Sequence, residues 1–135
     1  AAFLFAQLER ADEVNNKRLS LWSEYSKQLS SVDRLETQVI PDSVKHNGHM
    51  FYIKLKNIDE RQKIIKYLDF CGIQSVFHYL PLHESIKCLH YNSFNGDDEF
   101  TTVESEKLLR LPLYYCLEIS SVEFICNKVK EFFND

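Results

Sequence analysis

The sequence predicts an α+β domain in which helices cover one face of a small mixed or antiparallel sheet. Two observations support this prediction. Segments whose apolar residues recur at helical spacing alternate with short runs rich in β-branched and aromatic residues. The 135 residues also suffice for one domain with a real core, and 44% hydrophobic with 27% charged residues is an ordinary globular composition.

The chain begins with a long helix that we predict over residues 2–29. Its apolar stripe is interrupted by Asn15 and Arg18, so either the helix leaves the core partway along or it is shared between two bodies. The apolar start without an N-terminal cap favours the second interpretation, with both polar residues at the junction. We therefore expect 1–29 to be an inter-domain helix and 30–135 to be a small domain. The stripe consists of Leu4, Leu8, Ala11, Trp22, Tyr25 and Leu29.

Residues 30–47 are polar and contain Pro41, which predicts a linker with one short extended piece around Val39. The strongest strand signal follows at 50–56, with the sequence MFYIKLK.

A helix and a second strand are predicted next. Asp59 followed by Gln62 is a capping-box signature, and Gly72 ends the helix that it opens. The second strand is expected at 73–79, and 84–100 should be irregular because it contains an Asn-Gly-Asp-Asp turn. The apolar face of this helix consists of Ile64, Ile65, Leu68 and Cys71.

The C-terminal part repeats this alternation. Thr101 with Glu104 forms a second capping box for a short helix, and a short strand is expected at 110–113. Ser120 with Glu123 is expected to cap the last helix. The core face of that helix consists of Val122, Ile125, Val129 and either Phe132 or Phe133.

Composition excludes several classes of protein. The net charge of −4 gives no basic surface, which argues against nucleic acid as a partner. No apolar run approaches the roughly 20 residues that span a bilayer, and the apolar start lacks the basic flank of a signal peptide. Because position 1 is not Met, we expect the chain to be part of something longer.

Four cysteines form no CxxC pair and no regular framework, which indicates reduced thiols and a cytoplasmic location. Their even number leaves a disulfide open. They are Cys71, Cys88, Cys116 and Cys126.

The strongest candidate for a site is the segment 77–85, FHYLPLHES, where a strand breaks into a loop. Pro81 fixes its own φ and removes a donor from the sheet. Beside this turn, the phenol of Tyr79 and the imidazole of His83 can hydrogen-bond a hydroxylated or phosphorylated ligand. The alternative is that Tyr79 packs in the core and His83 caps a turn.

A metal site is the other hypothesis. His78, His83, Cys88 and His90 are possible ligands, but their spacing does not match a compact zinc motif. The alternative is a strand histidine, a loop histidine and two solvated residues. The chain has only three glycines, no glycine-rich phosphate loop, no GxSxG and no HExxH, so it offers no complete active site.

Several segments in order resemble the DegT–StrS group of sugar-nucleotide aminotransferases. Residues 1–9, AAFLFAQLE, followed by NKR at 16–18, look like the helix that joins the two domains of that group. HMFYI at 49–53 is similar to its first small-domain strand. FHYLPLH at 77–83 matches its tyrosine-x-Pro-Leu-His turn, and 101–113 matches its Leu-Pro-Leu strand region.

The resemblance implies the small domain of a fold type I pyridoxal-phosphate aminotransferase, homodimeric, with active sites at the subunit interface. It also implies that a larger N-terminal domain carries the Schiff-base lysine and the phosphate cradle, because no lysine here lies in the corresponding context. The chain would then hold no catalytic or cofactor-binding residue and be inactive alone. Tyr79, His83 and His78 would line the sugar-nucleotide side of the cleft. A stand-alone α+β binding or interaction domain without catalysis remains the alternative.

Overall fold

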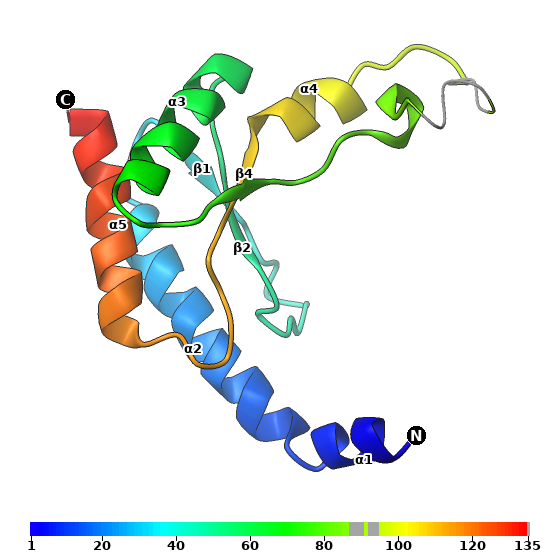
Figure 1. Cartoon of the computed structure of the whole chain (residues 1–135), viewed down its shortest axis with the longest axis vertical. Helices are drawn as coiled ribbons and strands as arrows, with labels where there is room; N and C mark the ends of the chain where they lie inside the picture. Colours follow the sequence, from blue (N-terminus) through cyan, green and yellow to red (C-terminus); the bar gives the residue numbers. More distant parts are fainter. Residues whose placement is uncertain (87–90, 92–94, 135) are drawn as a thin grey trace.

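The computed structural model describes residues 1–86, 91 and 95–134. Its four short strands form one sheet in the order β1-β2-β4-β3, and every neighbouring pair is antiparallel (Figure 1). Helices pack against this sheet, which confirms the predicted α+β class. The elements are α1 (Ala2–Leu8), α2 (Ala11–Leu29), β1 (Glu36–Thr37), β2 (Phe51–Lys54), α3 (Ile58–Phe70), β3 (Val76–Phe77), the 3₁₀ helix η1 (Leu82–Glu84), α4 (Thr101–Lys107), β4 (Leu108–Leu111) and α5 (Ile119–Asn134).

The two central strands show why the helices lie on one face of the sheet. In β2, Phe51 and Ile53 are fully buried whereas Tyr52 and Lys54 are only partly covered. β4 alternates in the same way, with Leu109 and Leu111 buried. Because alternate side chains of a strand point to opposite faces, one face of the sheet forms the core and the other stays more open.

Helices α2, α3 and α5 supply the other half of the core, and Figure 1 shows α2 and α5 side by side. Tyr25 of α2 stacks on Phe51 with 4.9 Å between ring centroids. Its hydroxyl donates a hydrogen bond of 2.8 Å to the carbonyl oxygen of Pro112, and burial raises the pKa of this phenol. Tyr25 therefore joins α2, β2 and the segment after β4.

The long N-terminal helix is present, but it is interrupted. The chain leaves helical hydrogen bonding at Glu9 and Arg10, so α1 is separate from α2 and diverges from it in Figure 1. Leu4 and Leu8 are both 61% exposed, whereas the other end of the stripe, including Leu29, is buried. The prediction of one continuous helix over 2–29 was wrong: α1 ends at Leu8, α2 begins at Ala11, and no residue of α1 is buried.

The caps differ from the predicted ones. Asn57, not Asp59, caps α3: its side chain accepts from the backbone N–H of Glu60 at 2.9 Å. The Glu60 carboxylate in turn accepts from the N–H of Lys56 at 2.9 Å. The N-cap therefore lies two residues before the one we identified, and the Glu60 carboxylate bonds the residue before the cap, so the predicted capping box was wrong. The helix end at Gly72 is confirmed, with φ of +76°.

The strands are shorter than predicted, and two are displaced. Of 73–79 only Val76–Phe77 forms a strand, because β3 pairs with only two residues of β4. β4 ends at Leu111 because Pro112 has no N–H for the ladder. The extended piece of the linker is β1, slightly before Val39.

Helix α5 begins at Ile119, where the carbonyl of Glu118 accepts from the N–H groups of Ser121 and Val122. The predicted cap at Ser120 was therefore wrong. The predicted core face is confirmed, and Phe133 is buried whereas Phe132 is only partly covered.

Two further features concern compartment. No helix in the described part of the chain is long and apolar enough to cross a membrane. Cys71, Cys116 and Cys126 are free thiols, and Cys88 lies outside the described residues.

Candidate functional site

The candidate turn leaves the sheet where β3 ends at Phe77. It extends with α4 away from the helical layer (Figure 1). Pro81 is buried, with φ of −55° and ψ of 141°, and the 3₁₀ helix η1 follows it. Leu80 and Leu82 are 55% and 77% exposed, so neither leucine anchors the turn in the core of this chain. Tyr79 is 64% exposed, which excludes the alternative that it packs in the core of this chain.

His83 is turned toward the N-terminus of α4. Its Nε2 lies 2.8 Å from Oδ2 of Asp98 and 3.1 Å from Oγ1 of Thr102. The His83 side chain is only 21% exposed. The ring is therefore held against a carboxylate fifteen residues away in sequence.

Asp98 connects the turn to α4. Its Oδ1 accepts from the backbone N–H of Thr101 at 2.9 Å, and its Oδ2 accepts from the Thr102 hydroxyl at 2.5 Å. These bonds cap α4, so the predicted Thr101–Glu104 box was wrong. The Thr102 hydroxyl, then the backbone N–H groups and His83, lower the pKa of Asp98 below its usual 3.8, against the opposing effect of burial.

The carboxylate has a chemical consequence for the imidazole. A neutral histidine that faces a carboxylate through Nε2 carries its proton on that nitrogen, which fixes the tautomer and the plane of the ring. Asp98 therefore orients His83. In many histidines that bind a ligand through one ring nitrogen, a carboxylate or carbonyl accepts from the other nitrogen and orients the ring in the same way.

His78 lies against the sheet instead. Its Nδ1 is 3.4 Å from Nη1 of Arg110, which donates, and its ring centroid is 3.8 Å from that of Tyr79. Burial lowers the pKa of His78, and the positive groups of Arg110 and His49 lower it further. The structure thus brings His78 and Tyr79 together, and gives His83 a different set of partners.

Sequence reasoning missed Asp98 and Arg110. Asp98 was assigned to an irregular turn, although an aspartate just before a helical segment is a capping signal. Arg110 gave no local signal, because only strand pairing places it beside β3.

The metal hypothesis gains no support from the described residues. No three of their His, Cys, Asp and Glu side chains form a group that could hold an ion. Two of the four candidate ligands, Cys88 and His90, lie outside the described residues. The other two, His78 and His83, face an arginine and an aspartate respectively.

A family model described as DegT/DnrJ/EryC1/StrS aminotransferase family matches residues 1–130. Among solved structures, the chain is similar to DesV from S. venezuelae in complex with a ketimine intermediate, with a TM-score of 0.87, 23% identity and coverage of 97% of this chain and 35% of that one. It is also similar to Helicobacter pylori PseC, an aminotransferase involved in pseudoaminic acid biosynthesis, with a TM-score of 0.86, 18% identity and coverage of 96% and 35%.

A third similar structure is a Streptococcus pneumoniae protein in its PLP-form, with a TM-score of 0.79, 22% identity and coverage of 95% of this chain and 33% of that one. At these identities the likeness concerns the fold. The chain spans about a third of the length of the structures it matches.

Proposed function

Because the chain belongs to the DegT/DnrJ/EryC1/StrS aminotransferase family, we propose that it forms the C-terminal small domain of a pyridoxal-phosphate-dependent sugar-nucleotide 4-aminotransferase. In the complete enzyme an amino group, from glutamate, passes to a dTDP-4-keto-6-deoxy sugar. The product serves surface-polysaccharide synthesis, in lipopolysaccharide or enterobacterial common antigen. The substrate is proposed from the motifs at 77–83 and 109–113, which resemble those of dTDP-4-amino-4,6-dideoxygalactose transaminase.

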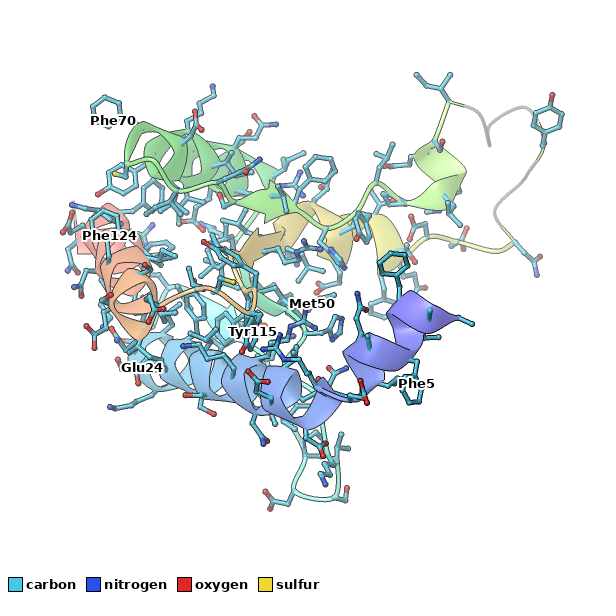
Figure 2. The ribbon with its side chains drawn as sticks, turned by 60° about the horizontal axis from the view of Figure 1, so that its bottom comes forward. Phe5, Glu24, Met50, Phe70, Tyr115 and Phe124 are labelled. Atoms are coloured by element: carbon cyan, nitrogen blue, oxygen red, sulfur yellow. The ribbon has the colours of Figure 1, made fainter. Side chains whose placement is uncertain are left out.

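The proposed domain organisation rests on the exposed start of the chain. Phe3 and Phe5 of α1 are 90% and 66% exposed, and Figure 2 shows Phe5 directed away from the sheet. Apolar side chains at such exposure are typical of a surface that another body covers. We assign 1–29 to the connection with a larger domain, 30–135 to the small domain, and the complete enzyme to a homodimer.

Two of the described lysines, Lys54 and Lys128, form ion pairs that do not suit the role of the Schiff-base residue. That role requires an amine that can lose its proton. Lys54 instead pairs with Glu104 and with Glu36, the latter at 3.3 Å, and Glu104 raises its pKa. Lys128 is 2.6 Å from Glu131, which raises its pKa as well. Because the resemblance assigns the Schiff-base lysine to the larger domain, the cofactor would be held by the remainder of the enzyme, and the chain alone should be inactive.

The residues of this chain would act on the sugar nucleotide. His83, oriented by Asp98, presents a fixed imidazole beside the turn, and this geometry is the observation that carries the proposed substrate role. The exposed phenol of Tyr79 can donate to a sugar hydroxyl or phosphate oxygen, with His78 packed against its ring. Their task is to bind and orient the substrate.

The test uses the complete enzyme and a 4-keto-6-deoxy sugar nucleotide with glutamate as donor. His83→Ala should lower kcat/KM by about one to two powers of ten, the effect of one hydrogen bond to a polar or charged group. Tyr79→Phe should lower it by about tenfold. Tyr67→Phe is the matched control, because its hydroxyl donates to Glu131 at 3.1 Å and Tyr67 is not part of the turn.

Two results would refute this function. Unchanged kcat/KM in His83→Ala and Tyr79→Phe, with normal activity of the unmodified enzyme, would remove the substrate role of the turn. Absence of any transfer to sugar nucleotides by the complete enzyme would refute the proposed reaction itself.

A further inference from the structure

A cavity of about 700 Å³ lies beside the sheet, and none of residues 77–83 lines it. The start of α5, the segment after β4 and residues 72–76 contribute to its wall. Figure 2 shows Met50, on one wall, near the middle of the molecule, and Phe124, on another wall, on α5. The volume is within the range of roughly 300–1,000 Å³ that small-molecule sites occupy.

The wall combines apolar side chains with two basic ones. Met50, Leu111 and Phe124 supply apolar surface, and Arg110 and His49 supply positive or protonatable groups. Within the described part of the chain, neither Arg110 nor His49 forms an ion pair with a carboxylate. A guanidinium is charged at all physiological pH values, so Arg110 brings to this wall a positive charge that forms no ion pair with a carboxylate of the described residues.

The neighbours of these two residues orient them toward a ligand. Nδ1 of His49 is 3.0 Å from Oδ1 of Asn47, which also accepts from the His49 backbone N–H at 3.2 Å. With the proton of Nδ1 directed at this oxygen, Nε2 is the nitrogen that can meet a ligand. His78 accepts from one nitrogen of Arg110 at 3.4 Å, which restrains the guanidinium, and a guanidinium has further N–H donors besides this one.

Positive potential in this region is also visible in His78. The pKa of its ring is lowered first by burial and then by Arg110 and His49, which face it from β4 and from the segment before β2. A bound anion would relieve part of this repulsion.

We infer that Arg110 and His49 form a binding site for the phosphate group of a small phosphate monoester, whose uncharged body lies against the apolar wall of the cavity. A guanidinium can bind two phosphate oxygens at once. With His49 as a second group that can be protonated, the site suits a doubly charged phosphate better than a singly charged carboxylate. His78 is a positioning residue for Arg110. Arg110 and His49 lie outside the proposed sugar-nucleotide turn, and His78 is the residue of that turn which adjoins this site.

The test titrates the 135-residue chain with phenyl phosphate, inorganic phosphate and benzoate at constant ionic strength, followed by calorimetry and by the histidine ring signals in NMR. Phenyl phosphate should bind saturably, about tenfold more tightly than inorganic phosphate because of the apolar wall and about tenfold more tightly than benzoate because of its second charge. The pKa of His78 should rise when phenyl phosphate saturates the site, a change that a purely structural histidine would not show.

Three variants locate the site. Arg110→Gln should weaken phenyl phosphate binding by about 10- to 100-fold, and His49→Gln by about threefold to tenfold. Arg34→Gln is the matched control, because Arg34 pairs with Glu60 at 3.1 Å and does not line the cavity. His49 is exposed, so its variant retains a test of the site should Arg110→Gln fail to fold.

The inference is overturned by any of three results. These are absence of saturable binding of phenyl phosphate, an equal loss in Arg34→Gln, or benzoate binding as tight as that of phenyl phosphate. Unchanged binding in a folded His49→Gln and a folded Arg110→Gln would likewise place the anion elsewhere.

Discussion

Gly48 should be the glycine that tolerates alanine least, because two separate costs coincide there. Its φ of +58° lies in the left-handed region, which side chains other than glycine rarely adopt. A Cβ at this position would also lie 3.1 Å from the carbonyl carbon and oxygen of Arg18 and from the nitrogen of Leu19. These contacts are with the backbone of α2, which cannot rotate away as a side chain can.

Two other glycines allow the cost of the left-handed backbone to be separated from the cost of contact with α2. Gly72 and Gly96 have φ of +76° and +90°, and a Cβ at either would meet nothing within 4 Å. The left-handed conformation costs about 1–2 kcal/mol, of which roughly 0.4–1 kcal/mol is offset by the restricted unfolded chain. Gly72→Ala should therefore lower the free energy of unfolding by about 1 kcal/mol. Gly48→Ala should lower it by about 2–3 kcal/mol, because the backbone of α2 must also shift, as the surroundings do when a core is overpacked.

Thermal and urea unfolding of the 135-residue chain would measure these losses, with fluorescence of its single tryptophan as the probe. Trp22 is buried in α2 and contacts Phe51, with 5.6 Å between ring centroids. At about 4 °C per kcal/mol for a domain of this size, Tm should fall by about 8–12 °C in Gly48→Ala and about 4 °C in Gly72→Ala. Equal losses in the two variants would refute the argument from contact with α2.

Three other predictions concern α1, Asp98 and the thiols. Because Phe3 and Phe5 are exposed, the isolated chain should self-associate through α1, and serine at both positions should give a monomer in sedimentation; a monomeric unmodified chain would contradict this. Because folding lowers the pKa of Asp98, the ionised carboxylate stabilises the fold at pH values above its usual pKa of 3.8. This stabilisation is lost as the pH falls through the lower pKa of the folded state. The urea midpoints of the unmodified chain and of Asp98→Asn should therefore converge on acidification. Burial raises the pKa of the Cys126 thiol to about 12, so iodoacetamide at pH 8 should modify exposed Cys116 and leave Cys126 intact, as mass spectrometry would show.

Local pattern in the sequence was sufficient to predict the buried faces of α3 and α5. The spacing of Ile64 and Leu68 predicted the buried face of α3, and that of Val122, Ile125 and Val129 predicted the buried face of α5. These predictions succeeded because a helix closes its hydrogen bonds within a few residues, so its buried stripe can be read from neighbouring positions. The α+β class followed from the same periodicities, and the family resemblance from motifs that lie within short segments.

The ends of elements were harder to predict, because several side chains compete for each cap. Asn57 and Asp59 are both good capping residues, and only the observed backbone of α3 selects Asn57. The break between α1 and α2 contains no glycine or proline, so no local sequence signal predicted it. It reflects packing, since α2 lies on the core and α1 does not.

The candidate site shows which features the sequence predicts and which depend on the tertiary structure. Sequence alone identified the turn with Tyr79, Pro81 and His83, because proline restricts its own backbone and the chemistry of the side chains is independent of the fold. Only the tertiary structure placed Asp98 on His83, and Arg110 on His78 across the β3–β4 pair. Such contacts join residues far apart in the chain, and they form only after strand pairing and helix packing have brought the segments together.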